Sequence, residues 1–234
     1  MAGVLAAAAS AGLTACSSAT PAAPAMTAHT VTLTADGRAR ATLDVLTGTT
    51  VLTIGVAAFR PGGPLVKVVT PAGAPAARLT PSNPDGTGGT ELVDLAAPDA
   101  PVVTVTLNAA VSWQLDLDGG TTRTDLDLRG GQVSGIAFNA GSSLISVALP
   151  QPHASVPVQM AGGATGFQLS LPAGIPARVT AGGGASEVSL EGQQHTGVAG
   201  GSVFTTPGWA PGVTGFDIDA IAGVSQLTVT ARAS

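Results

Sequence analysis

Residues 115–128 read LDLDGGTTRTDLDL, and the same pattern returns four times later in the chain. The later copies are IAFNAGSSLISVAL (136–149), VQMAGGATGFQLSL (158–171), VTAGGGASEVSL (179–190) and IDAIAGVSQLTV (218–229). In every copy, apolar residues alternate with other residues on both sides of a glycine, and these glycines are Gly120, Gly141, Gly163, Gly184 and Gly223. Such alternation is typical of a strand with one buried face, because successive side chains point to opposite sides. The stretch from 111 to 234 therefore predicts pairs of strands joined at glycine corners.

The spacing of these glycines indicates the architecture. Successive corners are 21, 22, 21 and 39 residues apart, and the last interval divides into 17 and 22 if Gly201 marks a further corner. A period of about twenty residues is typical of a solenoid, in which each rung buries its apolar face against its neighbours. Glycine suits the corners because it adopts positive φ. The predicted fold is an all-β solenoid with rungs about 21 residues apart, and an antiparallel β-sandwich is the alternative, since it shows the same alternation.

The first part of the chain repeats the pattern less regularly. Gly48 is followed by two threonines and an alternating run, as at the later corners, which predicts an early rung. Further strands are expected at 65–69, 92–95 and 102–107, whereas four prolines and several glycines predict a long loop at 71–89. We interpret 31–234 as a single β-rich domain, irregular over 31–112 and regular over 113–234.

The alternation also predicts which side chains form the core. Leu169 falls on the inward face and Gln168 on the outward face, and Trp113 falls on the inward face of its own strand.

The N-terminus resembles a bacterial lipoprotein leader. Residues 13–16 read LTAC, similar to the lipobox, after a short apolar run that suits the core of a signal peptide. We expect 1–15 to be a signal peptide, Cys16 to carry the lipid, and 16–30 to be a flexible tether rich in Ser, Ala, Pro and Thr. Cys16 is the only cysteine, so it forms no internal disulfide. One feature departs from the pattern: no Lys or Arg precedes the apolar run. The predicted location is the extracytoplasmic face of a bacterial cell membrane.

Composition excludes several functions. The formal net charge is −5 with a single lysine, so no basic surface is expected to hold nucleic acid. His29, His153 and His195 do not share a metal-ligand spacing, and no nucleophile elbow, phosphate loop or dinucleotide fingerprint occurs. We therefore predict no catalytic residues, no cofactor and no metal.

Two features remain as possible surface contacts. Asp116, Asp118, Asp125 and Asp127 surround the corner at 119–120 on outward positions. If the two pairs faced each other they could bind calcium or act as acid and base, but Arg123 and Arg129 favour a solvated, partly salt-bridged surface. Trp209 lies in a loop that reads PGWAPG (207–212). It is either an exposed contact or a lid over the end of the solenoid.

Several short segments together carry a family resemblance. They are the run 113–117, the double glycines, Leu149-Pro150, LPAGIP (171–176), GGGAS (182–186) and TTPGW (205–209). Over residues 100–230 the chain resembles the bacterial putative-adhesin (toast-rack-like) β-solenoid domains, most closely those of actinobacterial cell-envelope proteins of unknown function. The resemblance implies a structural or interaction module with no catalytic residues, whose partner is a cell-envelope protein or glycan.

Two other functions remain open. Domains of this kind are found fused to membrane regulators, so an accessory role in cell-envelope signalling is one alternative. A β-helix polysaccharide-active enzyme is the other, although the absence of tyrosine and the single lysine argue against it.

Overall fold

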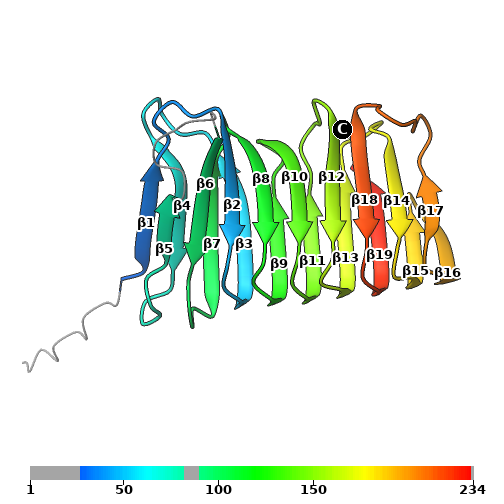
Figure 1. Ribbon diagram of the computed structural model, residues 1–234, viewed down its shortest axis with the longest axis horizontal. Helices are drawn as coiled ribbons and strands as arrows, with labels where there is room; N and C mark the ends of the chain where they lie inside the picture. The colour runs from blue at the N-terminus through cyan, green and yellow to red at the C-terminus, as the bar shows by residue number, and fades with distance from the viewer. Residues whose placement is uncertain (1–26, 82–89, 233–234) are drawn as a thin grey trace, which may run out of the picture.

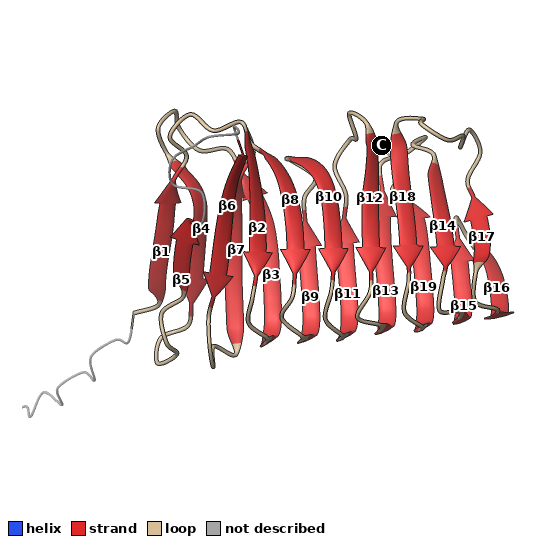
Figure 2. Cartoon of the chain, viewed as in Figure 1, coloured by secondary structure: helices blue, strands red, loops and turns tan. Residues whose placement is uncertain are grey.

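The computed structural model describes residues 27–81 and 90–232, and these form an elongated body of two packed β-sheets (Figure 1). The described residues contain strands, turns and loops (Figure 2). The expected lipid-attachment residue, Cys16, lies outside this part of the chain.

The ten-stranded sheet, called sheet A, has the following order: β1 (His29–Thr34), β4 (Pro64–Thr70), β7 (Val102–Asn108), β3 (Thr49–Ala57), β9 (Thr121–Asp127), β11 (Ser142–Ala148), β13 (Ala164–Leu171), β19 (Val224–Ala231), β15 (Ala185–Leu190) and β16 (Gln193–Val198). The nine-stranded sheet, called sheet B, has the following order: β17 (Ser202–Thr205), β14 (Ala177–Ala181), β18 (Gly215–Ala220), β12 (Ser155–Met160), β10 (Gln132–Phe138), β8 (Ser112–Leu117), β2 (Arg40–Val45), β6 (Thr90–Ala96) and β5 (Arg78–Pro81).

Each rung consists of one strand of sheet B followed by one strand of sheet A. The rungs are β6/β7, β2/β3, β8/β9, β10/β11, β12/β13, β18/β19 and β14/β15, and neighbouring rungs pair in parallel in both sheets. Antiparallel strands occur at the ends, where β1, β4 and β5 finish one side and β16 and β17 the other. The predicted solenoid is confirmed, and the parallel interior excludes the antiparallel sandwich.

The order of rungs in space differs from their order in the chain. The last pair, β18/β19, lies between β12/β13 and β14/β15 (orange to red beside yellow in Figure 1). The interval between Gly184 and Gly223 is long because it contains the two end strands, β16 and β17, in addition to β15 and β18. Gly201 does lie at a corner, but this corner leads from sheet A to sheet B, opposite to the others, so the prediction of an ordinary rung there is wrong.

Positive φ accounts for two of the five corner glycines, whereas the closest packing falls on glycines that precede a corner. Of the five corner glycines, Gly163 and Gly184 have φ of 73° and 82°, whereas the other three do not adopt positive φ. The corners stack on one another backbone to backbone, so a Cβ on Gly119 would lie 2.1 Å from the carbonyl oxygen of Thr47. The expectation of positive φ was thus only partly correct, and the backbone of the neighbouring corner excludes a side chain at the preceding positions Gly119 and Gly162.

The predicted core register is confirmed. Leu169 is 1% exposed, whereas Gln168 beside it is exposed on the outer face of sheet A. Trp113 is also 1% exposed, and its indole Nε1 donates a hydrogen bond of 3.0 Å to the carbonyl oxygen of Asn108.

The first part of the chain is more regular than its sequence suggests. The rungs β6/β7 and β2/β3 continue the parallel stack of the later repeats. Within the region expected to be a long loop, Arg78–Pro81 forms the edge strand β5, and β1 begins at His29, two residues before the expected domain start. A short strand beside proline is compatible with an edge position, because an edge strand needs no ladder on its outer side.

Candidate functional site

The outer face of sheet A carries a groove of about 510 Å³ that crosses five neighbouring strands. The surface is hollowed here because many of the outward side chains are small. The lining side chains that point outward come from β3, β9, β11, β13 and β19, and they are Thr53, Gly55, Asp125, Asp127, Ser146, Ala148, Gln168, Ser170, Thr228 and Thr230.

Parallel pairing arranges these side chains in two straight rows. One row is formed by Gly55, Asp127, Ala148, Ser170 and Thr230, each paired with the next. The other row contains Thr53, Asp125, Ser146, Gln168 and Thr228. Because neighbouring strands lie about 4.8 Å apart, the groove presents outward residues at a nearly constant interval along the long axis of the molecule, and all but Gly55 and Ala148 have polar side chains.

Asp125 and Asp127 lie in this groove and each is paired with an arginine. Arg123 Nε lies 2.6 Å from Asp125 Oδ2, and Arg129 Nε donates a hydrogen bond of 2.7 Å to Asp127 Oδ1. The hydrogen bonds from Arg129 lower the pKa of the Asp127 carboxyl, although partial burial acts in the opposite direction. The predicted salt-bridged surface is confirmed for these two residues.

Asp116 and Asp118 lie elsewhere. Asp116 is on β8 and Asp118 follows that strand, so both belong to the sheet B side, whereas Asp125 and Asp127 are on β9 in sheet A. All four point outward, but from opposite sides of the molecule. The two pairs therefore do not face each other, and the idea that they jointly form a calcium site or an acid–base pair is wrong.

Asp116 instead belongs to a row of carboxylates across sheet B. Asp94, Asp44 and Asp116 occupy directly paired positions on β6, β2 and β8. The pKa of Asp44 is raised, first by burial and then by the negative charges of Asp118, Asp94 and Asp116. One carboxylate oxygen of Asp44, Oδ1, is buried without a hydrogen-bond partner among the described residues.

Amide side chains balance part of this charge. Gln114 Nε2 donates to Asp116 Oδ1 at 3.0 Å, and Asn139 Nδ2 donates to Asp118 Oδ1 at 2.7 Å. Within residues 27–81 and 90–232, no group of three or more His, Cys, Asp or Glu side chains is arranged to hold a metal ion.

The sequence does indicate this row, through the spacing between each aspartate and its corner glycine. Asp44 lies four residues before Gly48, just as Asp116 lies four residues before Gly120. Once both glycines are recognised as corners of adjacent rungs, the two aspartates must be neighbours.

Trp209 contacts a charged side chain of β14. It is half-buried in the loop between β17 and β18, with the Arg178 guanidinium 5.8 Å from its ring centre. Arg178 also forms two hydrogen bonds to Asp217, at 2.8 and 2.6 Å, so the tryptophan packs on an ion pair. The rings of His195 and Phe204 stack at the end of the solenoid, 4.6 Å apart. His195 lies on the edge strand β16.

Comparison with known proteins supports the fold. No family model matches the chain, and no curated protein matches its sequence. A crystal structure of a putative cell adhesion protein from Clostridium sporogenes superposes with a TM-score of 0.65 and 14% sequence identity, covering 88% of this chain and 99% of that one. At this identity the similarity establishes a shared all-β architecture. No helix able to cross a membrane is found in the described part of the chain.

Proposed function

We propose that this chain is a non-catalytic, adhesin-like binding module, held through Cys16 on the extracytoplasmic face of a bacterial membrane, and that its partner binds in the groove of sheet A. The groove is the observation that carries this proposal, because it is a continuous surface depression lined by backbone and by small outward side chains. The shared fold with a protein described as a putative cell adhesion protein supports the same class of function.

The chemistry of the groove favours binding over hydrolysis. A glycosidase that uses two carboxyl groups needs one whose pKa is raised, so that it can donate a proton to the leaving group. In the groove the pKa of Asp127 is lowered by Arg129, and Asp125 is paired with Arg123. The carboxylate of Asp127 is thus placed to act as a fixed charge rather than as a proton donor.

A bulky neutral side chain in the groove tests the proposal. Ala148 lies in the floor on β11, so Ala148→Trp should block the groove without changing any charge. Ala137 occupies an outward, half-buried position on β10 of the same rung, but on sheet B, which makes Ala137→Trp the matched control. Binding of the purified proteins to isolated cell envelopes would be measured by co-sedimentation.

We expect Ala148→Trp to weaken binding by about tenfold or more, a loss of about 1.4 kcal/mol, and Ala137→Trp to bind like the wild type. Equal binding by all three proteins would show that the groove is not the contact surface. Turnover of a glycan, ester or peptide that a single side-chain change abolishes would contradict the non-catalytic assignment.

A further inference from the structure

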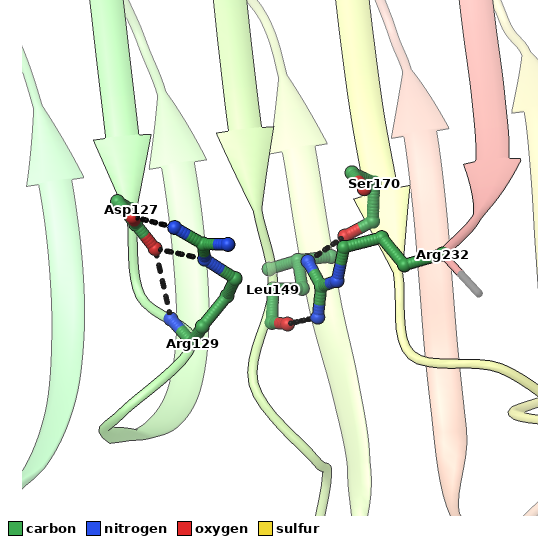
Figure 3. A network of polar contacts seen from close by, with 5 residues as sticks. All are labelled: Asp127, Arg129, Leu149, Ser170 and Arg232. Atoms are coloured by element: carbon green, nitrogen blue, oxygen red, sulfur yellow. Dashed lines mark hydrogen bonds and ion pairs between the residues drawn. The ribbon is translucent and has the colours of Figure 1, made fainter. Parts of the chain in front are cut away.

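Two arginines from distant parts of the chain meet beside the groove, where the strands of sheet A end. Arg129 follows β9, and Arg232 follows β19. Arg232 reaches across β13 and donates hydrogen bonds of 2.9 and 2.7 Å to the carbonyl oxygens of Ser170 and Leu149 (Figure 3). These contacts fix the guanidinium of Arg232 next to the groove, since Ser170 is one of its lining residues.

Arg129 turns a free donor toward the same place. Its Nε and one terminal nitrogen bind Asp127, while the other terminal nitrogen, which has no dashed line in Figure 3, points toward Arg232. Two guanidinium groups thus flank a position at the rim of the groove, and both retain N–H donors that no described residue occupies.

The charges at this position do not balance. Two guanidinium groups share one carboxylate, that of Asp127, and Arg232 makes no ion pair with any carboxylate in residues 27–81 and 90–232. Burial lowers the pKa of Arg232 and the positive charge of Arg129 lowers it further, whereas the charge of Asp127 acts in the opposite direction. A local surplus of positive charge in a chain of formal net charge −5 indicates that an anion would be attracted here.

We propose that Arg129 and Arg232 bind a carboxylate of an acidic polysaccharide that lies along the groove. This inference rests on the proposed binding function and adds the chemical class of the ligand. Guanidinium groups bind carboxylates through paired, charge-assisted hydrogen bonds.

The remainder of the groove favours a glycan over an acidic peptide. Its strands use their backbone groups in the sheet, so the floor offers no free ladder of the kind that binds an extended peptide at a sheet edge. It offers instead rows of side-chain hydroxyls, including Ser146, Ser170 and Thr228, which can both donate and accept hydrogen bonds with sugar hydroxyls.

The test uses oligogalacturonate long enough to span the groove, and its methyl ester as a neutral ligand with the same backbone. Binding to the purified full chain would be measured by titration calorimetry, with polyglutamate as the peptide probe. We expect binding of the acid form only, and we expect it to weaken as salt concentration rises, because exposed charges are screened.

Four variants separate the roles of the charges. Arg129→Gln and Arg232→Gln should each weaken binding by about tenfold, the value of one charge-assisted hydrogen bond. Arg40→Gln, which removes an exposed charge on β2 of sheet B and away from the groove, should change binding by less than about twofold. Asp127→Asn should strengthen binding by about threefold, because it removes the carboxylate that competes with the ligand for Arg129. A gain in affinity cannot arise from unfolding.

Several results would overturn the inference. Equal affinity for the acid and the ester, no binding of oligogalacturonate, or equal losses from Arg40→Gln and Arg129→Gln would each show that the arginine pair does not determine binding. Binding of polyglutamate as tight as that of oligogalacturonate would overturn the assignment to a glycan. In all these cases, loss of envelope binding in Ala148→Trp would still support the groove as a contact surface, so the two proposals fail separately.

Discussion

At the scale of single residues, Asp44 is the side chain whose environment is least favourable to its charge. It lies between Asp94 and Asp116 on adjacent parallel strands, and the pKa of its carboxyl is raised by burial and by the surrounding carboxylates. Like charges directly opposite each other destabilise a sheet. Arginines neutralise Asp125 and Asp127 on sheet A, whereas on sheet B the amides of Gln114 and Asn139 provide only partial compensation.

We predict that Asp44→Asn stabilises the fold at pH 7 by about 0.2–1 kcal/mol. Because the pKa of Asp44 in the folded state is above its ordinary value of 3.8, ionisation favours the unfolded chain. The wild type should therefore match the variant below pH 3.8 and fall behind it as the pH rises through the folded-state pKa. Urea unfolding at several pH values measures the difference. A variant less stable than the wild type at pH 7 would mean that the Asp44 carboxylate makes a favourable interaction there.

At the scale of the strand, the stability of each rung depends on the alternation between the two faces. Leu169 and Gln168 are adjacent on β13, yet one is buried between the sheets and the other is exposed in the groove. A shift of one residue in register would exchange the two faces. The stacked glycine corners oppose such a shift, because Gly119 and Gly162 lie too close to the neighbouring corners to admit a Cβ.

We predict that Leu169→Asp lowers the free energy of unfolding by about 3 kcal/mol or more, since it buries an unpaired charge in the packed core. Gln168→Asp places the same side chain one residue away on the surface and should change stability by less than about 0.5 kcal/mol. Thermal melts of both variants provide the comparison. Similar losses would contradict the assignment of inward and outward positions.

This local regularity explains how far the sequence alone predicts the structure. Alternation and corner glycines predicted the strands, the register and the burial of Trp113, because these depend on neighbouring residues in the chain. The position of β18/β19 between two earlier rungs could not be predicted, since every rung presents the same backbone edge and any rung can pair with any other. The arginine pair was missed for the same reason: Arg129 and Arg232 become neighbours only through the order of the strands.

At the scale of the whole molecule, the solenoid is an elongated body with two different ends. One end is formed by β1, β4 and β5, and the other by β16 and β17 (Figure 1). Strand β1 begins at His29 and directly follows the segment that contains Cys16. A membrane anchor at Cys16 would therefore attach to the β1 end, and the groove, which lies on the central strands, would remain accessible along the side of the body.

We predict that Cys16→Ala releases the protein from the membrane. The lipid of a bacterial lipoprotein provides more than one acyl chain, and two such chains are sufficient for stable anchoring, whereas a single short chain gives only reversible binding. Cells that express the wild type, Cys16→Ala and the neighbouring control Ser17→Ala would be separated into membrane and soluble fractions and labelled with a radioactive fatty acid. The wild type and Ser17→Ala should carry the label and remain with the membrane, while Cys16→Ala should lose both properties. Membrane association that persists unchanged in Cys16→Ala would show that the protein is held by its folded body, for instance through the groove, and not by a lipid.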